Sequence, residues 1–125
     1  MKGIFSALMV PYNEDGSINE NGLREIVRHN IDNMKVDGLY VGGSTGENFM
    51  ISTEEKKRVF EIAIDEAKDQ VQLIAQVGSI NVFESVELGK YATKLGYKCL
   101  SAVTPFYYKF SFEEIKEYYF TIVRE

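Results

Sequence analysis

Apolar and polar stretches alternate regularly along the chain. Four short runs rich in Val, Ile, Leu and aromatic residues each precede a longer segment whose apolar positions recur at helical spacing. Because the short runs are almost continuously apolar, we expect a parallel sheet that is buried on both faces. The predicted strands cover residues 4–10, 38–41, 71–77 and 99–103, and the predicted helices cover 21–35, 82–95 and segments starting near 52 and 111.

Start and stop signals support these helices. Ser52 with Glu55, and Ser111 with Glu114, have the spacing of capping boxes, in which side chains and backbone N–H groups bond reciprocally. Gly96 is placed to cap the third helix. The side chains expected to face the core are Leu23, Ile26, Val27, Ile31 and Met34 in the first helix, Val59, Phe60, Ala63 and Ala67 in the second, Val82, Val86, Tyr91 and Leu95 in the third, and Ile115, Tyr118, Tyr119, Ile122 and Val123 in the fourth.

The order of these elements predicts an α/β fold of four βα units. Each unit spans roughly 30 residues, as right-handed βα crossovers require. Two architectures fit: an open doubly wound sheet, or the N-terminal half of a (β/α)8 TIM barrel, which needs about 250 residues. Residues 123–125 still read as helix, which favours the half-barrel. We therefore expect residues 1–125 to be the truncated N-terminal half of one domain, with no internal boundary.

Composition excludes several classes of partner. The chain has 125 residues and a formal net charge of -5, which argues against nucleic acid, because phosphate binding needs clustered Lys and Arg. No apolar run approaches the roughly 20 residues that span a membrane. Cys99 is the single cysteine, so no internal disulfide can form and a cytoplasmic location is expected. We expect Cys99 to be a buried structural thiol.

The loop Gly42–Glu47, of sequence Gly-Gly-Ser-Thr-Gly-Glu, is the strongest candidate for a binding site. It follows a predicted strand, and ligands of α/β folds bind at the carboxyl ends of strands. Glycines let backbone N–H groups approach an anion, and Ser44 and Thr45 add hydroxyl groups. The loop carries no positive charge, which suits a carboxylate or carbonyl better than a triphosphate. A plain turn capped by the two hydroxyls is the alternative.

The aromatic loop, residues 104–110, also follows a predicted strand. Four of its residues are aromatic: Phe106, Tyr107, Tyr108 and Phe110. One interpretation is a hydrophobic plug or a subunit contact. The other is a phenol that moves a proton at the site.

Other chemistry is excluded by residue type. His29 is the single histidine and lies on the polar side of a predicted helix. With one His and one Cys, neither a histidine-based triad nor a multi-histidine metal site can be built. We expect Glu47 to brace the glycine-rich loop rather than to react.

Two segments carry a resemblance to a known family. The run Gly38–Glu47 resembles the keto-acid-binding segment of the N-acetylneuraminate lyase and dihydrodipicolinate synthase superfamily. The run Ser101–Tyr108, with Phe110–Glu114 after it, is similar to the bacterial lyase branch. The synthase branch usually has Thr-Thr where this chain has Ser44-Thr45. Lys109 departs from the proline that is common in the lyases.

The resemblance implies a Schiff-base aldolase on a (β/α)8 barrel. Such enzymes reversibly cleave N-acetylneuraminate to pyruvate and N-acetylmannosamine, without a metal or an organic cofactor. Gly43, Ser44 and Thr45 would hold the pyruvyl carboxylate, Ser44 would join the proton relay, and Tyr107 would reach into a neighbouring subunit's site. The resemblance also implies a homotetramer.

The Schiff-base lysine and the proton-transfer tyrosine of this family lie on the sixth and fifth barrel strands. Lys2 and Lys98 stand at the amino ends of predicted strands, and Lys109 lies in a polar loop without the desolvation that activates an amine. We therefore expect residues 1–125 alone to be inactive and, with two free strand edges, to self-associate or to be only marginally folded. The alternatives are another pyruvate-dependent aldolase of the synthase type and a non-catalytic half-barrel that binds a small acid or a subunit.

Overall fold

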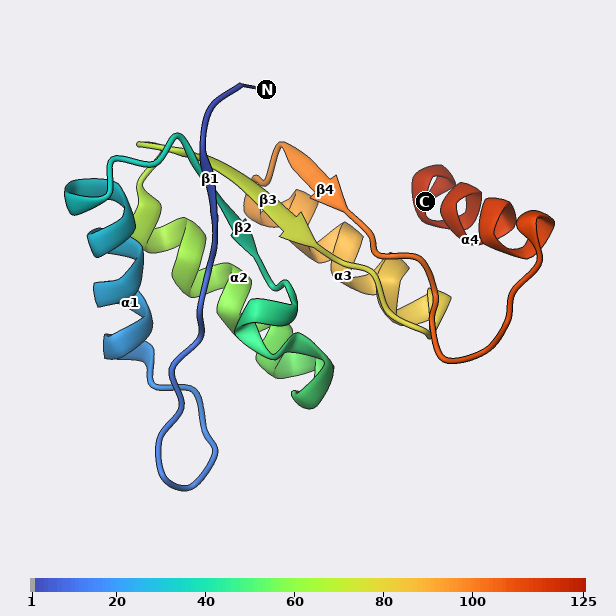
Figure 1. The fold of residues 1–125 in the computed structure, drawn as a ribbon, viewed down its shortest axis with the longest axis horizontal. Coiled ribbons are helices and arrows are strands. Elements are labelled where there is room, and N and C mark those ends of the chain that lie inside the picture. Colours follow the sequence, from blue (N-terminus) through green and yellow to red (C-terminus); the bar gives the residue numbers. More distant parts are fainter. Residues whose placement is uncertain (1) are drawn as a thin grey trace.

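A computed structural model describes residues 2–125 as strands and helices in strict alternation (Figure 1). The strands are β1 (Phe5–Ala7), β2 (Gly38–Val41), β3 (Gln72–Gln76) and β4 (Cys99–Ser101). The α-helices are α1 (Glu20–Arg28), α2 (Thr53–Ala67), α3 (Val82–Leu95) and α4 (Phe112–Arg124). Three short helices complete the set: η1 (His29–Asn33), a π-helix, and η2 (Ser44–Gly46) and η3 (Asn48–Met50), both 3-10 helices.

The strands form one parallel sheet in the order β1-β2-β3-β4. Leu39 pairs with Leu73, and Ala75 pairs with Leu100. The expected architecture of four consecutive βα units is thereby confirmed. Because all strands run the same way, the loops that follow them lie at one edge of the sheet.

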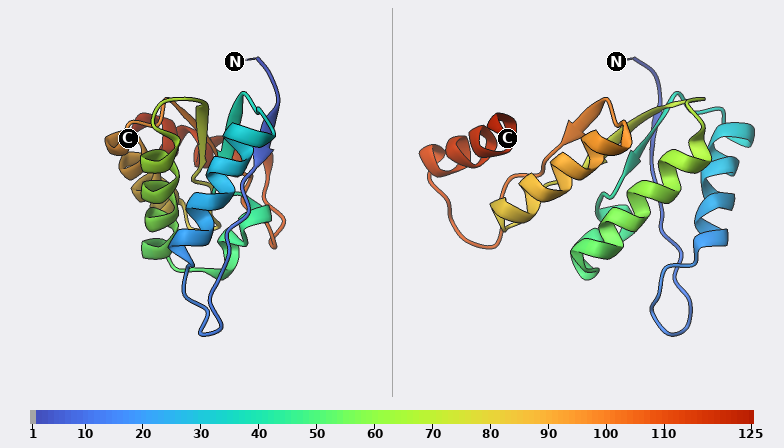
Figure 2. Two further views of the ribbon diagram at one scale, coloured as in Figure 1. Left: turned by 90° about the vertical axis from the view of Figure 1, so that its left-hand side faces the viewer. Right: turned by 180° about the vertical axis from the view of Figure 1, so that it is seen from behind.

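The helices α1, α2 and α3 cover one face of this sheet, as two opposite views show (Figures 1 and 2). Leu39, Val41, Ala75 and Val77 point to that face and are completely buried. On the other face Tyr40 and its strand partner Ile74 are only half-buried, and its partner Ala7 is exposed. The expectation of burial on both faces is therefore wrong for residues 2–125, where helices cover one side.

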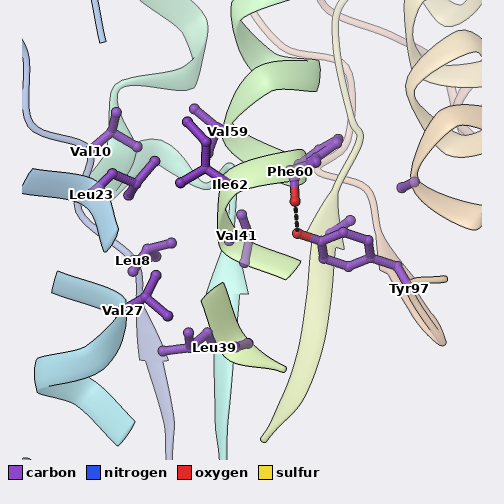
Figure 3. Packing of buried hydrophobic residues seen from close by; sticks show 14 of the residues in the cluster. Leu8, Val10, Leu23, Val27, Leu39, Val41, Val59, Phe60, Ile62 and Tyr97 are labelled. Atoms are coloured by element: carbon purple, nitrogen blue, oxygen red, sulfur yellow. Dashed lines mark hydrogen bonds between the residues drawn. The ribbon is translucent and has the colours of Figure 1, made fainter. Parts of the chain in front are cut away.

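The core lies between the sheet and these helices. Side chains of α1 pack against those of β2 and of the segment after β1, and side chains of α2 pack against the same group (Figure 3). The buried cluster includes Leu8, Val10, Leu23, Val27, Leu39, Val41, Val59, Phe60 and Ile62. Tyr97 joins it and donates a 2.9 Å hydrogen bond to the Phe60 carbonyl (Figure 3). Burial of such apolar surface is the main stabilising contribution in a domain of this kind.

The predicted helix ends are confirmed. Both capping boxes are formed, with the Ser52 hydroxyl accepting from the Glu55 N–H, and the Ser111 hydroxyl from the Glu114 N–H. Gly96 ends α3 with φ +105°, a left-handed conformation that costs a glycine least. These local signals determine where the helices begin and end. They therefore also determine the lengths of the loops between strands and helices.

The buried stripe of α3 differs from the expected one. Val82, Val86, Tyr91 and Leu95 are half-buried. The buried residues are instead Ser85, Leu88, Gly89 and Ala92. Small residues let this helix approach the sheet closely, so the contact face is turned away from the largest apolar side chains.

Other departures occur at element ends. The first helix leaves α geometry after Arg28 and continues as η1, so that Met34 is 63% exposed. Val123 of α4 is 80% exposed, although Tyr118 is buried as expected. Cys99 is half-buried rather than buried, because β4 is an outer strand of the sheet. Within residues 2–125 no helix is both long and apolar enough to cross a membrane.

Two glycines of the third βα unit give a test of this geometry. We expect Gly96→Ala to lower the free energy of unfolding by about 1–2 kcal/mol, because an alanine is disfavoured at positive φ. A Cβ at Gly96 would lie 3.7 Å from Ile64 Cδ1, so the cost is backbone strain, not a clash. The measurement is urea unfolding of the whole protein.

The matched control is Gly89→Ala in the interior of α3. Its Cβ would lie 3.6 Å from Leu100 Cδ1, an ordinary contact, and alanine is favoured over glycine in a helix by up to about 1 kcal/mol. We expect this variant to be as stable as the wild type or more so. Equal losses in the two variants would contradict the assigned conformation of Gly96.

Candidate functional site

The glycine-rich loop Gly42–Glu47 turns sharply at the carboxyl end of β2. Gly42 has φ +77°, and a Cβ there would lie 2.8 Å from Phe60 Cε1 and 3.3 Å from the Gln76 carbonyl oxygen. Both the positive φ and the close neighbours require glycine. The turn directs the next residues away from the sheet and into η2.

The loop offers several neutral hydrogen-bond donors. Two backbone hydrogen bonds stabilise its conformation. The Gly46 N–H donates to the Gly43 carbonyl at 3.0 Å, and the Glu47 N–H donates to the Ser44 carbonyl at 2.9 Å. Within residues 2–125, the N–H groups of Ser44 and Thr45 donate to no backbone oxygen outside η2, and both residues are exposed. Two hydroxyls and two free N–H groups on adjacent residues can together bind a carboxylate.

Two tyrosines support this loop from the protein side. The Tyr12 hydroxyl donates to the Gly46 carbonyl at 2.9 Å. Burial, with smaller effects from Glu47 and Glu55, raises the pKa of Tyr12, so the phenol stays a donor at neutral pH. The ring of Tyr40 lies against Gly43, where a Cβ would come within 2.8 Å of Tyr40 Cε1.

The support continues across the sheet. The Tyr40 hydroxyl lies 3.0 Å from the Ser101 Oγ on β4. Gln76, at the end of β3, hydrogen-bonds the Gly42 carbonyl. Sequence reasoning missed Tyr12, Tyr40 and Gln76. For Gln76 a signal was present, because a polar residue interrupts an otherwise apolar strand at the end where ligands bind.

Glu47 closes the loop through its backbone. It adopts φ +57°, a left-handed conformation, and separates η2 from η3. Its side chain is exposed, and its charge acts on Tyr12. The expectation that Glu47 braces the loop stays a prediction.

The aromatic loop reaches the same edge of the sheet. Phe106 packs edge-on against Phe49 of η3, with ring centroids 4.8 Å apart. Tyr107 is 86% exposed and has φ +77°, a strained conformation for a residue with a Cβ, of the kind that clusters at functional sites. Its ring packs edge-on against that of Tyr108, with the ring centroids 5.0 Å apart. Within residues 2–125 no hydrogen bond joins Tyr107 to Ser44 or Thr45.

The lysines of the chain are poorly placed for nucleophilic chemistry. Lys56 is buried, but it forms an ion pair with Glu84 at 2.7 Å. Burial raises the pKa of Glu84, but hydrogen bonds from Lys56, Ser79 and Thr53 outweigh it and leave that pKa lowered. Lys109 is exposed. An exposed or ion-paired ammonium lacks the desolvation that makes an amine nucleophilic.

Metal-binding side chains are likewise dispersed. His29 is exposed, as expected. Among residues 2–125 no three His, Cys, Asp or Glu side chains gather where they could hold an ion. The site therefore consists of neutral donors on the glycine-rich loop, with the aromatic loop beside it.

The family model of the dihydrodipicolinate synthetase family matches residues 1–125. The chain belongs to this family. The match includes both the glycine-rich loop after β2 and the aromatic loop after β4. It agrees with the resemblance read from Gly38–Glu47 and Ser101–Tyr108.

Relatives within the family are very similar. The chain is 88% identical over 125 residues to the N-acetylneuraminate lyase of Fusobacterium nucleatum, covering 100% of this chain and 43% of the relative. A crystal structure of that lyase complexed with pyruvate has a TM-score of 0.94 at 86% identity, over 99% of this chain and 42% of the other. A Clostridium difficile structure in complex with mannosamine has a TM-score of 0.98 at 69% identity. The match covers 99% of this chain and 43% of the other.

The family also contains synthases, which are more distant. A dihydrodipicolinate synthase structure superimposes with a TM-score of 0.93 at 31% identity, over 99% of this chain and 42% of the synthase. The two branches thus share this fold, and sequence identity favours the lyases. The chain spans about 43% of the length of the curated relatives it matches.

Proposed function

We propose that this chain is the carboxylate-binding half of an N-acetylneuraminate lyase. The observation that carries the proposal is the loop Gly42–Glu47, with its free N–H groups and hydroxyls, in a chain 88% identical to such a lyase. The whole protein would reversibly cleave N-acetylneuraminate to pyruvate and N-acetylmannosamine. The synthase alternative is less well supported, because identity to the synthase structure falls to 31%.

In this proposal Gly43, Ser44 and Thr45 hold the carboxylate of the keto acid. Charge-assisted hydrogen bonds from neutral donors are short and strong in such a setting. They orient the keto carbon toward the amine with which it forms a Schiff base. We propose that this lysine, and the tyrosine that transfers protons, lie outside residues 1–125, since the lysines described above are exposed or ion-paired.

Ser44 and Tyr107 are proposed to move protons. Ser44 combines a carboxylate contact with a hydroxyl that can relay a proton. Tyr107 is exposed at the same edge of the sheet and held in a strained conformation. We propose that it reaches the site of a neighbouring subunit in a homotetramer, which explains its exposure within one chain.

Borohydride trapping tests the reaction class. The whole protein from its natural source is treated with pyruvate and sodium borohydride, which reduces a Schiff base to a stable secondary amine. We expect one reduced pyruvyl adduct by intact mass, mapped by peptide analysis to a lysine outside residues 1–125. An adduct on Lys109 would contradict the proposed position of the lysine, and no adduct would exclude a Schiff-base aldolase.

Substitution of Ser44 tests the carboxylate site. We expect Ser44→Ala to lower kcat/KM by roughly 10- to 150-fold, because it removes a hydrogen bond to a charged group worth about 1.5–3 kcal/mol. The control is Ser44→Thr, which keeps the hydroxyl at an exposed position and is expected to retain most of the activity. Unchanged kinetics in Ser44→Ala would exclude the role of Ser44.

Two neighbouring phenols test the aromatic loop. We expect Tyr107→Phe to lower kcat by about 10²-fold, the lower end of the contribution of positioned proton transfer, with little change in Tm. Tyr108→Phe is the matched control, since it removes a hydroxyl from the adjacent exposed ring. Wild-type turnover in Tyr107→Phe would favour the hydrophobic-plug interpretation.

A further inference from the structure

Gln76 is a buried polar residue at the end of β3. It is 4% exposed and pairs in register with Ser101 of β4. A buried amide costs free energy unless its groups are hydrogen-bonded. The partners of this amide therefore show what the residue does.

All the partners of the Gln76 amide are backbone groups of three strand ends. Its Oε1 accepts from the Gly78 N–H at 2.5 Å and from the Val103 N–H at 3.3 Å. Its Nε2 donates to the Gly42 carbonyl at 3.4 Å and to the Gly78 carbonyl at 3.3 Å. One side chain thus connects the segments that leave β2, β3 and β4.

The connection to β2 ends at the glycine that begins the binding loop. The orientation of the Gly42 carbonyl is coupled through the rigid peptide plane to the N–H of Gly43. The ring of Phe60 lies close to Gly42, where a Cβ would come within 2.8 Å of Phe60 Cε1. The residue that starts the loop therefore has two neighbours that restrict it, the ring of Phe60 and the amide of Gln76.

The connection to β4 requires a close approach of two backbones. A Cβ at Gly78 would lie 2.5 Å from the Val103 nitrogen and 2.7 Å from the Gln76 Oε1. Gln76 supplies both donors and acceptors, so it can satisfy N–H and C=O groups at the same time. An apolar residue would leave these groups unpaired, and a carboxylate could accept but not donate.

We propose that Gln76 is a positioning residue that holds the glycine-rich loop in its anion-binding conformation. It acts through the Gly42 carbonyl and does not touch the bound acid. The consequence for affinity rests on the proposed function: Gln76 sets how tightly the keto-acid carboxylate is bound at Ser44 and Thr45, and leaves binding of the sugar product unaffected.

The test compares Gln76→Met and Gln76→Glu in the whole protein with the same changes at Gln72. Gln72 is the exposed first residue of β3, so Gln72→Met and Gln72→Glu are matched controls. The kinetic measurement is condensation of pyruvate with N-acetylmannosamine. The structural measurement is amide hydrogen exchange of peptides that contain residues 42–47.

We expect Gln76→Met to raise the KM for pyruvate about 10-fold, the loss expected for an intramolecular hydrogen bond, and to leave the KM for N-acetylmannosamine unchanged. Exchange of the loop amides is expected to accelerate in the same variant. In Gln76→Glu the KM for pyruvate is expected to approach the wild-type value as the pH falls from about 8 to about 6, because protonation restores a neutral donor. The Gln72 variants are expected to match the wild type.

Unchanged loop exchange and unchanged KM for pyruvate in Gln76→Met would overturn the proposal, as would an equal rise of both KM values. If Gln76→Met does not fold, the pH dependence of Gln76→Glu decides. Hydrogen exchange needs no turnover. A wild type without pyruvate chemistry would therefore refute the proposed function, while loop exchange still tests Gln76.

Discussion

The structure depends on burial of one face of a parallel sheet under three helices. Leu39, Val41, Ala75 and Val77 alternate with residues of the opposite face, and they are completely buried. A slip of one residue between β2 and β3 would exchange the two faces and expose this set. The apolar contact therefore sets the register, and the register sets which residues reach the carboxyl edge.

The candidate site is a consequence of that register. Parallel pairing brings Gly42 and Gln76 close together, although 34 residues separate them in sequence. It also brings the aromatic loop beside η3, where Phe106 meets Phe49. The anion binding proposed for the loop would need a rigid frame, because each donor would have to stay within hydrogen-bond distance of its ligand. The partly buried hydrogen bond from Tyr12 and the buried one from Gln76 hold the loop at Gly46 and Gly42.

Much of this arrangement could be predicted from local signals. The capping boxes at Ser52 and Ser111, the cap at Gly96 and the position of the glycine-rich loop depend on a few adjacent residues, so the sequence alone revealed them. Element order predicted four βα units, and it fitted either an open doubly wound sheet or a half-barrel. The sheet order β1-β2-β3-β4 agrees with the half-barrel. The family resemblance rested on the same segments that the structure brings to one edge.

What could not be predicted depends on contacts between distant segments. The buried stripe of α3 runs through Gly89 and Ala92 because small residues permit close approach, whereas periodicity gives most weight to large side chains. The hydrogen bonds of Gln76 join Gly42, Gly78 and Val103, which only the folded sheet brings together. The π-helical turn of η1 and the positive φ of Tyr107 likewise arise from surrounding packing, and single residues do not reveal them.

The absence of Lys and Arg from the loop Gly42–Glu47 determines how it selects ligands. Peptide and hydroxyl dipoles act over hydrogen-bond distances, whereas the attraction of a full charge extends over about 10 Å at 0.1 M salt. The loop therefore does not concentrate anions around itself, and its share of the binding free energy is almost independent of ionic strength. A loop of this kind gives a polyphosphate no long-range attraction, so it distinguishes anions by their size and by the fit of their oxygens to its donors.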